Sequence, residues 1–253
     1  MTFPDPPKDH KPSRVVATFG GAAPPGVTPA LLDGIHPEMT QDRRRNGAKP
    51  QQGPKPPLVA FDFDGTITTT DSFTAFLKWR AGPFRYALGL IKLAPAAIGY
   101  LVHRDRGRIK ARAAWEFLKG APKAELEDEA RAFAEIHAPK LFRPDALATW
   151  RRWRAEGARL VIVSASPDFV VAPFAEKLGA DRLIATGMAY DAEHRVAGVF
   201  ATPNCRGPEK IVRLRQAFGG DFQLKAAYGD TSGDREMLAH AEIKGFKVFR
   251  GKP

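Results

Sequence analysis

The sequence predicts an α/β protein with a mostly parallel sheet and a helical segment inserted after the first strand. Five short apolar runs have the length and composition of buried strands, at residues 58–63, 159–163, 182–186, 225–229 and 243–249. Helical patterns separate most of these runs, and strands that alternate with helices indicate a parallel sheet. A long, almost purely helical stretch follows the first run, which indicates the insertion.

The first 57 residues predict a disordered tail. They hold 12 of the 22 prolines, a Gly-Gly pair and the run Arg43-Arg44-Arg45, with little hydrophobic periodicity. Such a composition cannot bury enough apolar surface to offset the entropy of ordering. We therefore place the start of the folded domain at Leu58.

Residues 58–71 and 144–253 are expected to form the core domain. Helical patterns occupy residues 144–156, 168–178, 208–218 and 234–241, between the later strand patterns. Residues 190–200 carry polar residues in their middle and are expected to form an inserted hairpin.

Residues 72–143 are expected to form a helical cap. They contain no second strand pattern and are too long for one crossover connection. Ligands of open α/β sheets bind beyond the carboxyl ends of the strands. The predicted cap would cover that edge.

The composition excludes several classes of protein. Hydrophobic residues make up 43% and charged residues 26%, so the chain is neither wholly disordered nor a polytopic membrane protein. The single cysteine, Cys205, rules out an intramolecular disulfide and suits a reducing compartment. No apolar core follows a basic start, so no signal peptide is expected. We predict a cytoplasmic protein.

The positive charge is concentrated in two segments. The net charge is +11, and residues 78–112 hold nine Lys or Arg against Asp105 alone, while the remaining excess lies in residues 1–57. Two partners suit such a distribution, nucleic acid and anionic lipid headgroups.

Asp62 and Asp64 follow the first strand pattern directly. In an extended chain, side chains two residues apart point to the same face, where two carboxylates can serve as nucleophile and as acid or base. An acidic turn after a strand is an equally good interpretation of this motif alone.

Other reactive side chains occur at further strand ends and helix starts. Ser164 ends an apolar run, Lys210 begins a helical pattern, and Asp230 and Asp234 follow another run. Each has an ordinary interpretation as a cap, a solvated charge or a turn residue. Together they predict that a hydroxyl, a cation and several carboxylates meet at one edge of the sheet.

This order of motifs resembles the haloacid dehalogenase superfamily. Its Asp-x-Asp-x-Thr motif matches Asp62, Asp64 and Thr66, and the other three motifs match Ser164, Lys210 and the acidic loop with Asp230 and Asp234. The resemblance implies a Rossmann-like core and phosphoryl transfer through an aspartyl-phosphate. The helical insertion resembles the C1 cap of the phosphoserine-phosphatase-like subfamily.

The resemblance also implies a role for each residue. Asp62 would attack phosphorus, and Asp64 would protonate the leaving group and later activate water. Thr66, Ser164 and Lys210 would bind the phosphoryl oxygens. Mg²⁺ would be held by the side chains of Asp62 and Asp230 and by the carbonyl of Asp64, with Asp234 supporting this site from behind.

The substrate is less closely specified. The cap and the sequence Asn204-Cys205-Arg206-Gly207-Pro208-Glu209-Lys210 look most like the phosphatidylglycerophosphate phosphatase branch, which implies a lipid phosphomonoester. The alternative is a small soluble substrate such as phosphoserine. Against it, the loop after Asp64 lacks the acidic residue that phosphoserine phosphatases use on the substrate amine, and Ser164-Ala165-Ser166 replaces their Ser-Gly-Gly. Nucleic acid is not the expected partner, because it would not explain the acidic motifs.

Residues 86–102 are expected to form an apolar helix whose only charge is Lys92. Lys92 near the middle and Pro95 argue against a membrane-spanning helix. The helix either packs within the cap or lies in an anionic membrane surface, where its basic neighbours would contact headgroups. These neighbours are Lys78, Arg80, Arg104, Arg106, Arg108, Lys110 and Arg112. The second interpretation places the protein at the inner face of the cytoplasmic membrane.

Overall fold

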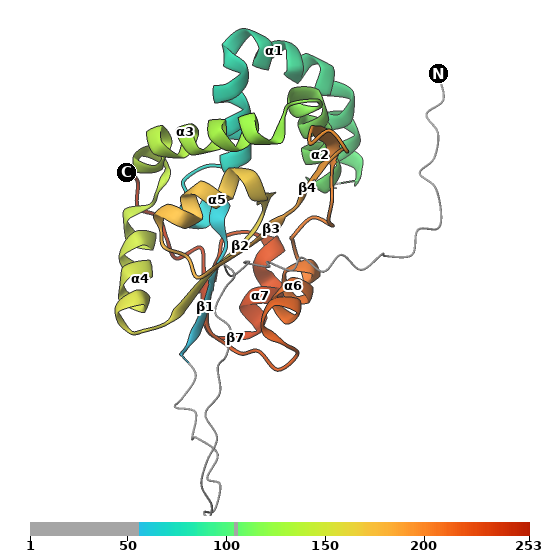
Figure 1. Ribbon diagram of the computed structural model, residues 1–253. Coiled ribbons are helices and arrows are strands. Elements are labelled where there is room, and N and C mark those ends of the chain that lie inside the picture. The colour runs from blue at the N-terminus through green and yellow to red at the C-terminus, as the bar shows by residue number, and fades with distance from the viewer. Residues whose placement is uncertain (1–55, 104–105) are drawn as a thin grey trace, which may run out of the picture. The chain divides into compact units, whose positions relative to one another are not determined.

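The structure is a computed structural model that describes residues 56–103 and 106–253 (Figure 1). The side chains of residues 95–103 and of Arg106 are not part of this description. The predicted tail lies outside it except for Pro56 and Pro57, and Arg104 lies outside it as well.

Five parallel strands form the core sheet in the order β3-β2-β1-β6-β7. Their bounds are β1 Leu58–Phe61, β2 Arg159–Pro167, β3 Arg182–Thr186, β6 Leu224–Gly229 and β7 Ala241–Phe246. Phe61 at the end of β1 pairs with Ile162 of β2 and with Tyr228 of β6. The carboxyl ends of the three central strands therefore open on the same edge, which confirms the predicted fold class.

Two strands differ from their predicted bounds by three or more residues at one end. β2 continues past Val163 to Pro167, with a register shift against β3 before Pro167 pairs with Thr186. β7 begins at Ala241 and ends at Phe246, earlier than the apolar run indicated. The extension of β2 carries Ser164 and Ser166 beyond the level at which β1 ends.

Helices cover both faces of the sheet. Val59 and Phe61 of β1 belong to one apolar cluster with α4 (Pro144–Ala155) and α5 (Asp168–Lys177). Ala60 belongs to another, with α6 (Pro208–Phe218) and α7 (Arg235–Ala239). Alternate residues of a strand point to opposite faces. A strand covered in this way on both sides must be apolar throughout, which explains its continuous apolar run.

Three helices lie between β1 and α4. They are α1 (Ser72–His103), α2 (Arg106–Leu118) and α3 (Lys123–Leu141), at the top of the view in Figure 1. Phe76 of α1 and Phe133 of α3 pack edge to face, and each also contacts a phenylalanine of α5, Phe169 and Phe174 respectively. The start of α1 and α3 thus share the apolar core of the sheet domain.

The remaining cap helix, α2, packs against α1 and against a small hairpin. The hairpin consists of β4 (Met188–Tyr190) and β5 (Val196–Phe200), which are antiparallel as expected for residues 190–200. A Cβ atom on Gly198 would lie 2.7 Å from the Trp115 ring, so this glycine permits close packing of β5 against α2. The backbone of Gly120 and Ala121, just after α2, also bonds to Val196.

The apolar residues of α1 are divided between two faces. Gly82, with φ of 70°, interrupts the helix. Beyond it, Gly89 lies against Phe117 of α2, where a Cβ atom would come within 2.2 Å of the ring. Phe84, Leu88 and Ile91 face outward, with 78%, 46% and 70% of their surface exposed. In the described part of the chain, no helix is both long and apolar enough to cross a membrane.

Candidate active site

The first strand delivers Asp62 to the centre of the carboxyl edge. The Asp62 backbone N–H donates to the carbonyl of Tyr228, which extends the β1–β6 pairing by one residue. A tight helical turn, η1 (Phe63–Ile67), follows at once. Gly65 in this turn has φ of 82°, and a Cβ atom there would lie 2.3 Å from Asp230 Oδ2. The turn therefore requires glycine both for its backbone conformation and for the close approach of Asp230.

Lys210 joins three segments of the core through its ammonium group. Its Nζ donates to Asp62 Oδ1 at 2.6 Å, to Asp234 Oδ1 at 2.7 Å and to the Val163 carbonyl at 2.6 Å. Only 1% of its surface is exposed. All three ammonium hydrogens are thus used, and the buried charge is fully paired.

Asp234 holds the acidic loop in place. Its Oδ2 accepts hydrogen bonds from the Thr231 backbone and hydroxyl, both at 2.9 Å, and from the Asp230 backbone at 3.3 Å. Its Oδ1 accepts from Lys210. Because both oxygens already have partners, the contacts of Asp234 agree with the predicted supporting position.

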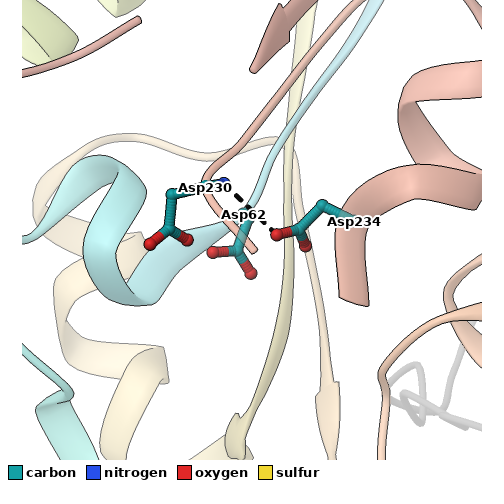
Figure 2. Close-up of side chains that lie close together, drawn as sticks. All are labelled: Asp62, Asp230 and Asp234. Carbon is teal, nitrogen blue, oxygen red and sulfur yellow. Dashed lines mark hydrogen bonds between the residues drawn. The ribbon is translucent and has the colours of Figure 1, made fainter. Parts of the chain in front are cut away.

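Three carboxylates come together at this edge. Oxygens of Asp62, Asp230 and Asp234 all lie within 4.8 Å of one another, and Figure 2 shows the three side chains converging from β1 and the loop after β6. The Thr66 hydroxyl lies 3.2 Å from Asp62 Oδ2 and 3.4 Å from Asp230 Oδ1. Such a set of hard oxygen donors fits a divalent cation of the Mg²⁺ type.

Asp64 points toward the cap. Its Oδ1 accepts a 2.7 Å hydrogen bond from the backbone of Ser72, the first residue of α1, and its Oδ2 accepts from the Ser166 hydroxyl. Lys110 Nζ of α2 lies 3.1 Å from Ser166 Oγ and 3.1 Å from Asp71 Oδ2. The two predicted catalytic aspartates therefore have different surroundings, Asp62 in the core and Asp64 beside the cap.

The environment shifts the pKa values of these groups in different directions. Burial raises the pKa of Asp62 to about 7, against the attraction of Lys210. Burial, with the charge of Asp71, also raises the pKa of Asp64. Desolvation would do the same to Asp234, but Lys210 outweighs it and lowers that pKa. Carboxylates whose pKa values are shifted in opposite directions within one cluster are typical of active sites.

A cavity of about 590 Å³ opens above the carboxylates. Asp62, Asp64, Lys210 and Asp230 line its floor, and Arg206 and Asn204 line it from the loop before α6. The cap contributes mostly apolar walls, which include Phe73, Leu77, Leu90, Leu93, Ile109 and Phe117. The cavity can thus hold a molecule with a phosphate at one end and an apolar group at the other.

The structure brings all seven predicted site residues to this edge. Ser164 is completely buried, and its Oγ accepts from the Ser166 backbone while the neighbouring Ala165 lines the cavity. Direct contact of Ser164 and Thr66 with a phosphoryl group stays a prediction.

Sequence reasoning missed four polar residues of the site, Asp71, Lys110, Ser166 and Arg206. Asp71, in the loop after Asp64, lines the cavity, and the expectation that this loop lacks the acidic residue that phosphoserine phosphatases use on the substrate amine stays a prediction. Lys110 was assigned only to the basic surface of the cap. Arg206 donates to the hydroxyls of Thr231 and Ser232 in the acidic loop. No local pattern shows these contacts, although Ser166 lies only two residues after a predicted site residue.

Comparison with known proteins identifies similar sequences and structures. Residues 59–239 match the protein family described as haloacid dehalogenase-like hydrolase. Protein CicA of Caulobacter vibrioides is 59% identical over 203 residues, which cover 80% of this chain and 91% of that protein.

Two solved structures share the fold. A protein of unknown function from Bordetella pertussis Tohama I has a TM-score of 0.61 and 23% identity, over 72% of this chain and 85% of that one. A phospho-aspartyl intermediate analogue of phosphoserine phosphatase has a TM-score of 0.50 and 21% identity, over 74% of this chain and 84% of that one.

Proposed function

This chain belongs to the haloacid dehalogenase-like hydrolase family, and from that premise we propose that it is a Mg²⁺-dependent phosphatase acting through an aspartyl-phosphate. One observation carries the proposal: two carboxylates two residues apart have separate hydrogen-bond partners. Asp62 accepts from Lys210, whereas Asp64 accepts from Ser72 and Ser166. Two carboxylates in different environments can divide the roles of nucleophile and acid. The similarity to a phospho-aspartyl analogue of phosphoserine phosphatase supports the same assignment.

Asp62 attacks the phosphorus atom, and its oxygen forms a bond to phosphorus as the ester bond breaks. Asp64 gives its proton to the departing alkoxide and then takes a proton from the water that attacks the aspartyl-phosphate. That water releases inorganic phosphate and restores the Asp62 carboxylate. Lys210, with Thr66 and Ser164, stabilises the charge on the phosphoryl oxygens.

The acidic cluster suits a resident Mg²⁺ ion. The carboxylates of Asp62 and Asp230 and the backbone carbonyl of Asp64 would hold it, with Asp234 fixing the loop behind them. Bound there, the ion would supply positive charge between the carboxylate nucleophile and the phosphate dianion. The fixed cation Lys210 balances only part of the negative charge of this cluster.

We propose an amphiphilic substrate, a membrane lipid phosphate such as phosphatidylglycerophosphate. The apolar walls of α1 and α2 support this class, because a small polar metabolite would leave them in contact with water. A specific observation also favours a second candidate substrate, phosphoserine. Asp71 and Lys110 line the cavity and offer a carboxylate and an ammonium group, which would suit the amine and carboxylate of phosphoserine.

The outer face of α1 supports contact with a membrane. Phe84, Leu88 and Ile91 form this outer apolar face, and Leu90 is both half-exposed and part of the cavity wall. An acyl chain could therefore pass from a bilayer into the cavity along apolar surface. Arg85 and Lys92 are both exposed, but Lys92 pairs with Glu116 of α2 at 3.1 Å, so only part of their charge is left for anionic headgroups. We propose that the protein docks there on an anionic lipid surface.

A phosphate-release screen with Mg²⁺ tests the proposed activity. The substrates are vesicle-embedded phosphatidylglycerophosphate, phosphoserine and a sugar phosphate, each with the wild type and with Asp62→Asn. We expect release from the lipid that Asp62→Asn abolishes. Preferred hydrolysis of phosphoserine would select the second candidate, and no release from any phosphomonoester would contradict the phosphatase proposal.

A further inference from the structure

The carboxyl group of Asp64 is held on both sides. Its Oδ1 accepts from the Ser72 backbone at the start of the cap, and its Oδ2 accepts from the hydroxyl of Ser166, which is completely buried at the end of β2. Each carboxylate oxygen has two acceptor positions, so these bonds fix the direction of the group without occupying every site for a proton. The orientation of Asp64 thus depends on Ser166.

Ser166 has a second partner on the cap. Lys110 Nζ lies 3.1 Å from Ser166 Oγ. An ammonium group can only donate, and a hydroxyl has a single hydrogen to give. Lys110 must therefore donate to Ser166, which leaves the serine hydrogen free to point at Asp64. The charge of Lys110 also polarises the hydroxyl and strengthens its bond to the carboxylate.

Lys110 itself is positioned by cap residues. It lies on α2, which packs on α1 and β5, and its Nζ pairs with Asp71 Oδ2 at 3.1 Å. Only 19% of its side chain is exposed. The contact between Lys110 and Ser166 therefore crosses from the cap to the end of a core strand, and a displacement of α2 would break it.

We propose that Lys110 is a positioning residue that orients the proton-transfer group Asp64 through the hydroxyl of Ser166. The inference rests on the proposed function and adds to it a dependence of proton transfer on the docking of α2. Lys110 acts through Ser166 and makes no contact with Asp62 among the hydrogen bonds and ion pairs of the described residues. Its loss should affect protonation of the leaving group and later activation of water, and spare the attack of Asp62 on phosphorus.

Two substrates separate these steps. The phenolate that leaves 4-nitrophenyl phosphate is stable without a proton, whereas the alkoxide that leaves hexyl phosphate requires one. We compare kcat and KM on both esters for Lys110→Met, Ser166→Ala and the conservative variant Lys110→Arg. Lys119→Met is the matched control, because Lys119 follows α2, is exposed and rests on the Trp115 ring.

For Lys110→Met we expect kcat/KM, which reports the steps up to phosphoryl transfer to Asp62, to fall roughly tenfold or more on hexyl phosphate and to stay within about twofold on 4-nitrophenyl phosphate. Lys110→Arg should recover part of the loss, and the control should behave as wild type. The double variant Lys110→Met/Ser166→Ala should lose no more than Ser166→Ala alone, because the two residues act in series.

Three results would overturn the inference. They are equal losses of kcat/KM on both esters, additive losses in the double variant, and an effect confined to KM, which would make Lys110 a substrate contact. A wild-type protein that hydrolyses neither ester would instead reject the proposed function, and the inference with it.

Discussion

Lys210 Nζ lies 2.6 Å from Asp62 Oδ1, and both side chains are almost completely buried. The same ammonium group bonds to Asp234 at 2.7 Å, so one cation stands between two carboxylates. Desolvation opposes the charge on Lys210, but the two carboxylates outweigh it and raise the pKa of the ammonium group. Lys210 therefore stays charged and holds Asp62, the acidic loop and β2 together.

Replacing Lys210 should strongly destabilise the fold. Lys210→Met leaves Asp62 and Asp234 buried side by side without their cation, and we expect a loss of about 3–5 kcal/mol in the free energy of unfolding. Denaturant unfolding at neutral pH measures it. Lys225→Met is the control, because Lys225 pairs with Glu242 on the surface and should contribute at most about 1 kcal/mol. Equal losses in the two variants would contradict this account of the buried cluster.

Substitutions of the two aspartates in the first motif should impair activity and Mg²⁺ binding in different ways. Asp62→Asn removes the nucleophile and one charge of the metal site, so turnover should fall to background and Mg²⁺ should bind more weakly. Asp64→Asn keeps its backbone carbonyl, and we expect Mg²⁺ affinity close to wild type with turnover of an alkyl phosphate lowered roughly 10²- to 10⁴-fold. Phosphate release and Mg²⁺ titration calorimetry measure the two effects. Undiminished activity of Asp62→Asn would end the proposed mechanism.

Mg²⁺ affinity should depend on pH. Burial raises the pKa of Asp62 to about 7, so in the metal-free protein this carboxyl takes up a proton as the pH falls through 7. Mg²⁺ binds the ionised form, and its affinity should therefore rise from about pH 6 to about pH 8 and then level off. Calorimetry in buffers of different ionisation enthalpy should detect the released proton. The slope should be smaller in Asp62→Asn, and a pH-independent affinity in the wild type would contradict the prediction.

Gly65 should be essential for the position of Asp230. In Gly65→Ala the new methyl group would meet Asp230 Oδ2 at 2.3 Å, and the backbone would hold alanine at a φ of 82°. We expect Mg²⁺ affinity to fall at least about tenfold, because a shifted ligand loses its geometry. Gly157→Ala is the matched control: its φ is 74°, and no atom lies within 4 Å of the added methyl. Both variants should lose about 1–2 kcal/mol of stability through backbone strain. Weaker Mg²⁺ binding in both variants would show that the loss of affinity does not come from displacement of Asp230, which would contradict the prediction.

Much of the fold and of the carboxylate cluster could be predicted because parallel strands share one constraint. Their carboxyl ends lie at one edge, so residues that follow different strands, such as Asp62 and Asp230, must meet there. Lys210 was predictable for a similar reason, since the start of α6 returns to the same edge. Short apolar runs also defined most strands within a few residues.

The cap contacts could not be predicted in this way. Lys110 and Ser166 are 56 positions apart in the sequence, and their contact depends on how α2 packs against α1 and the hairpin. The outward face of α1 could not be predicted either, because it also depends on how α1 and α2 pack. Its apolar run predicted a helix, but the close approach of Gly89 to Phe117 decides which side faces α2 and leaves Phe84 and Ile91 exposed.

This outward face leads to the last prediction, which concerns lipid binding. Moving an exposed Phe, Leu or Ile side chain out of water contributes roughly 1.5–3 kcal/mol when burial is complete, and each Lys or Arg near an anionic surface adds about 1 kcal/mol. The wild type should therefore co-sediment with phosphatidylglycerol vesicles and bind neutral phosphatidylcholine vesicles more weakly. High salt should reduce only the electrostatic part of this binding.

The triple variant Phe84→Ser/Leu88→Ser/Ile91→Ser should reduce vesicle binding by at least about tenfold, because it removes the apolar contribution and leaves the charges. None of the three side chains lines the cavity, so hydrolysis of a soluble phosphoester should not change. The matched control replaces three apolar residues that are exposed elsewhere on the described surface, Ile136, Val212 and Ile243, by serine. Equal binding by both triple variants would reject the lipid surface. If the wild type instead self-associates in solution and the Phe84 variant does not, the face is a contact between two copies of the chain, and the substrate must reach the cavity from solution.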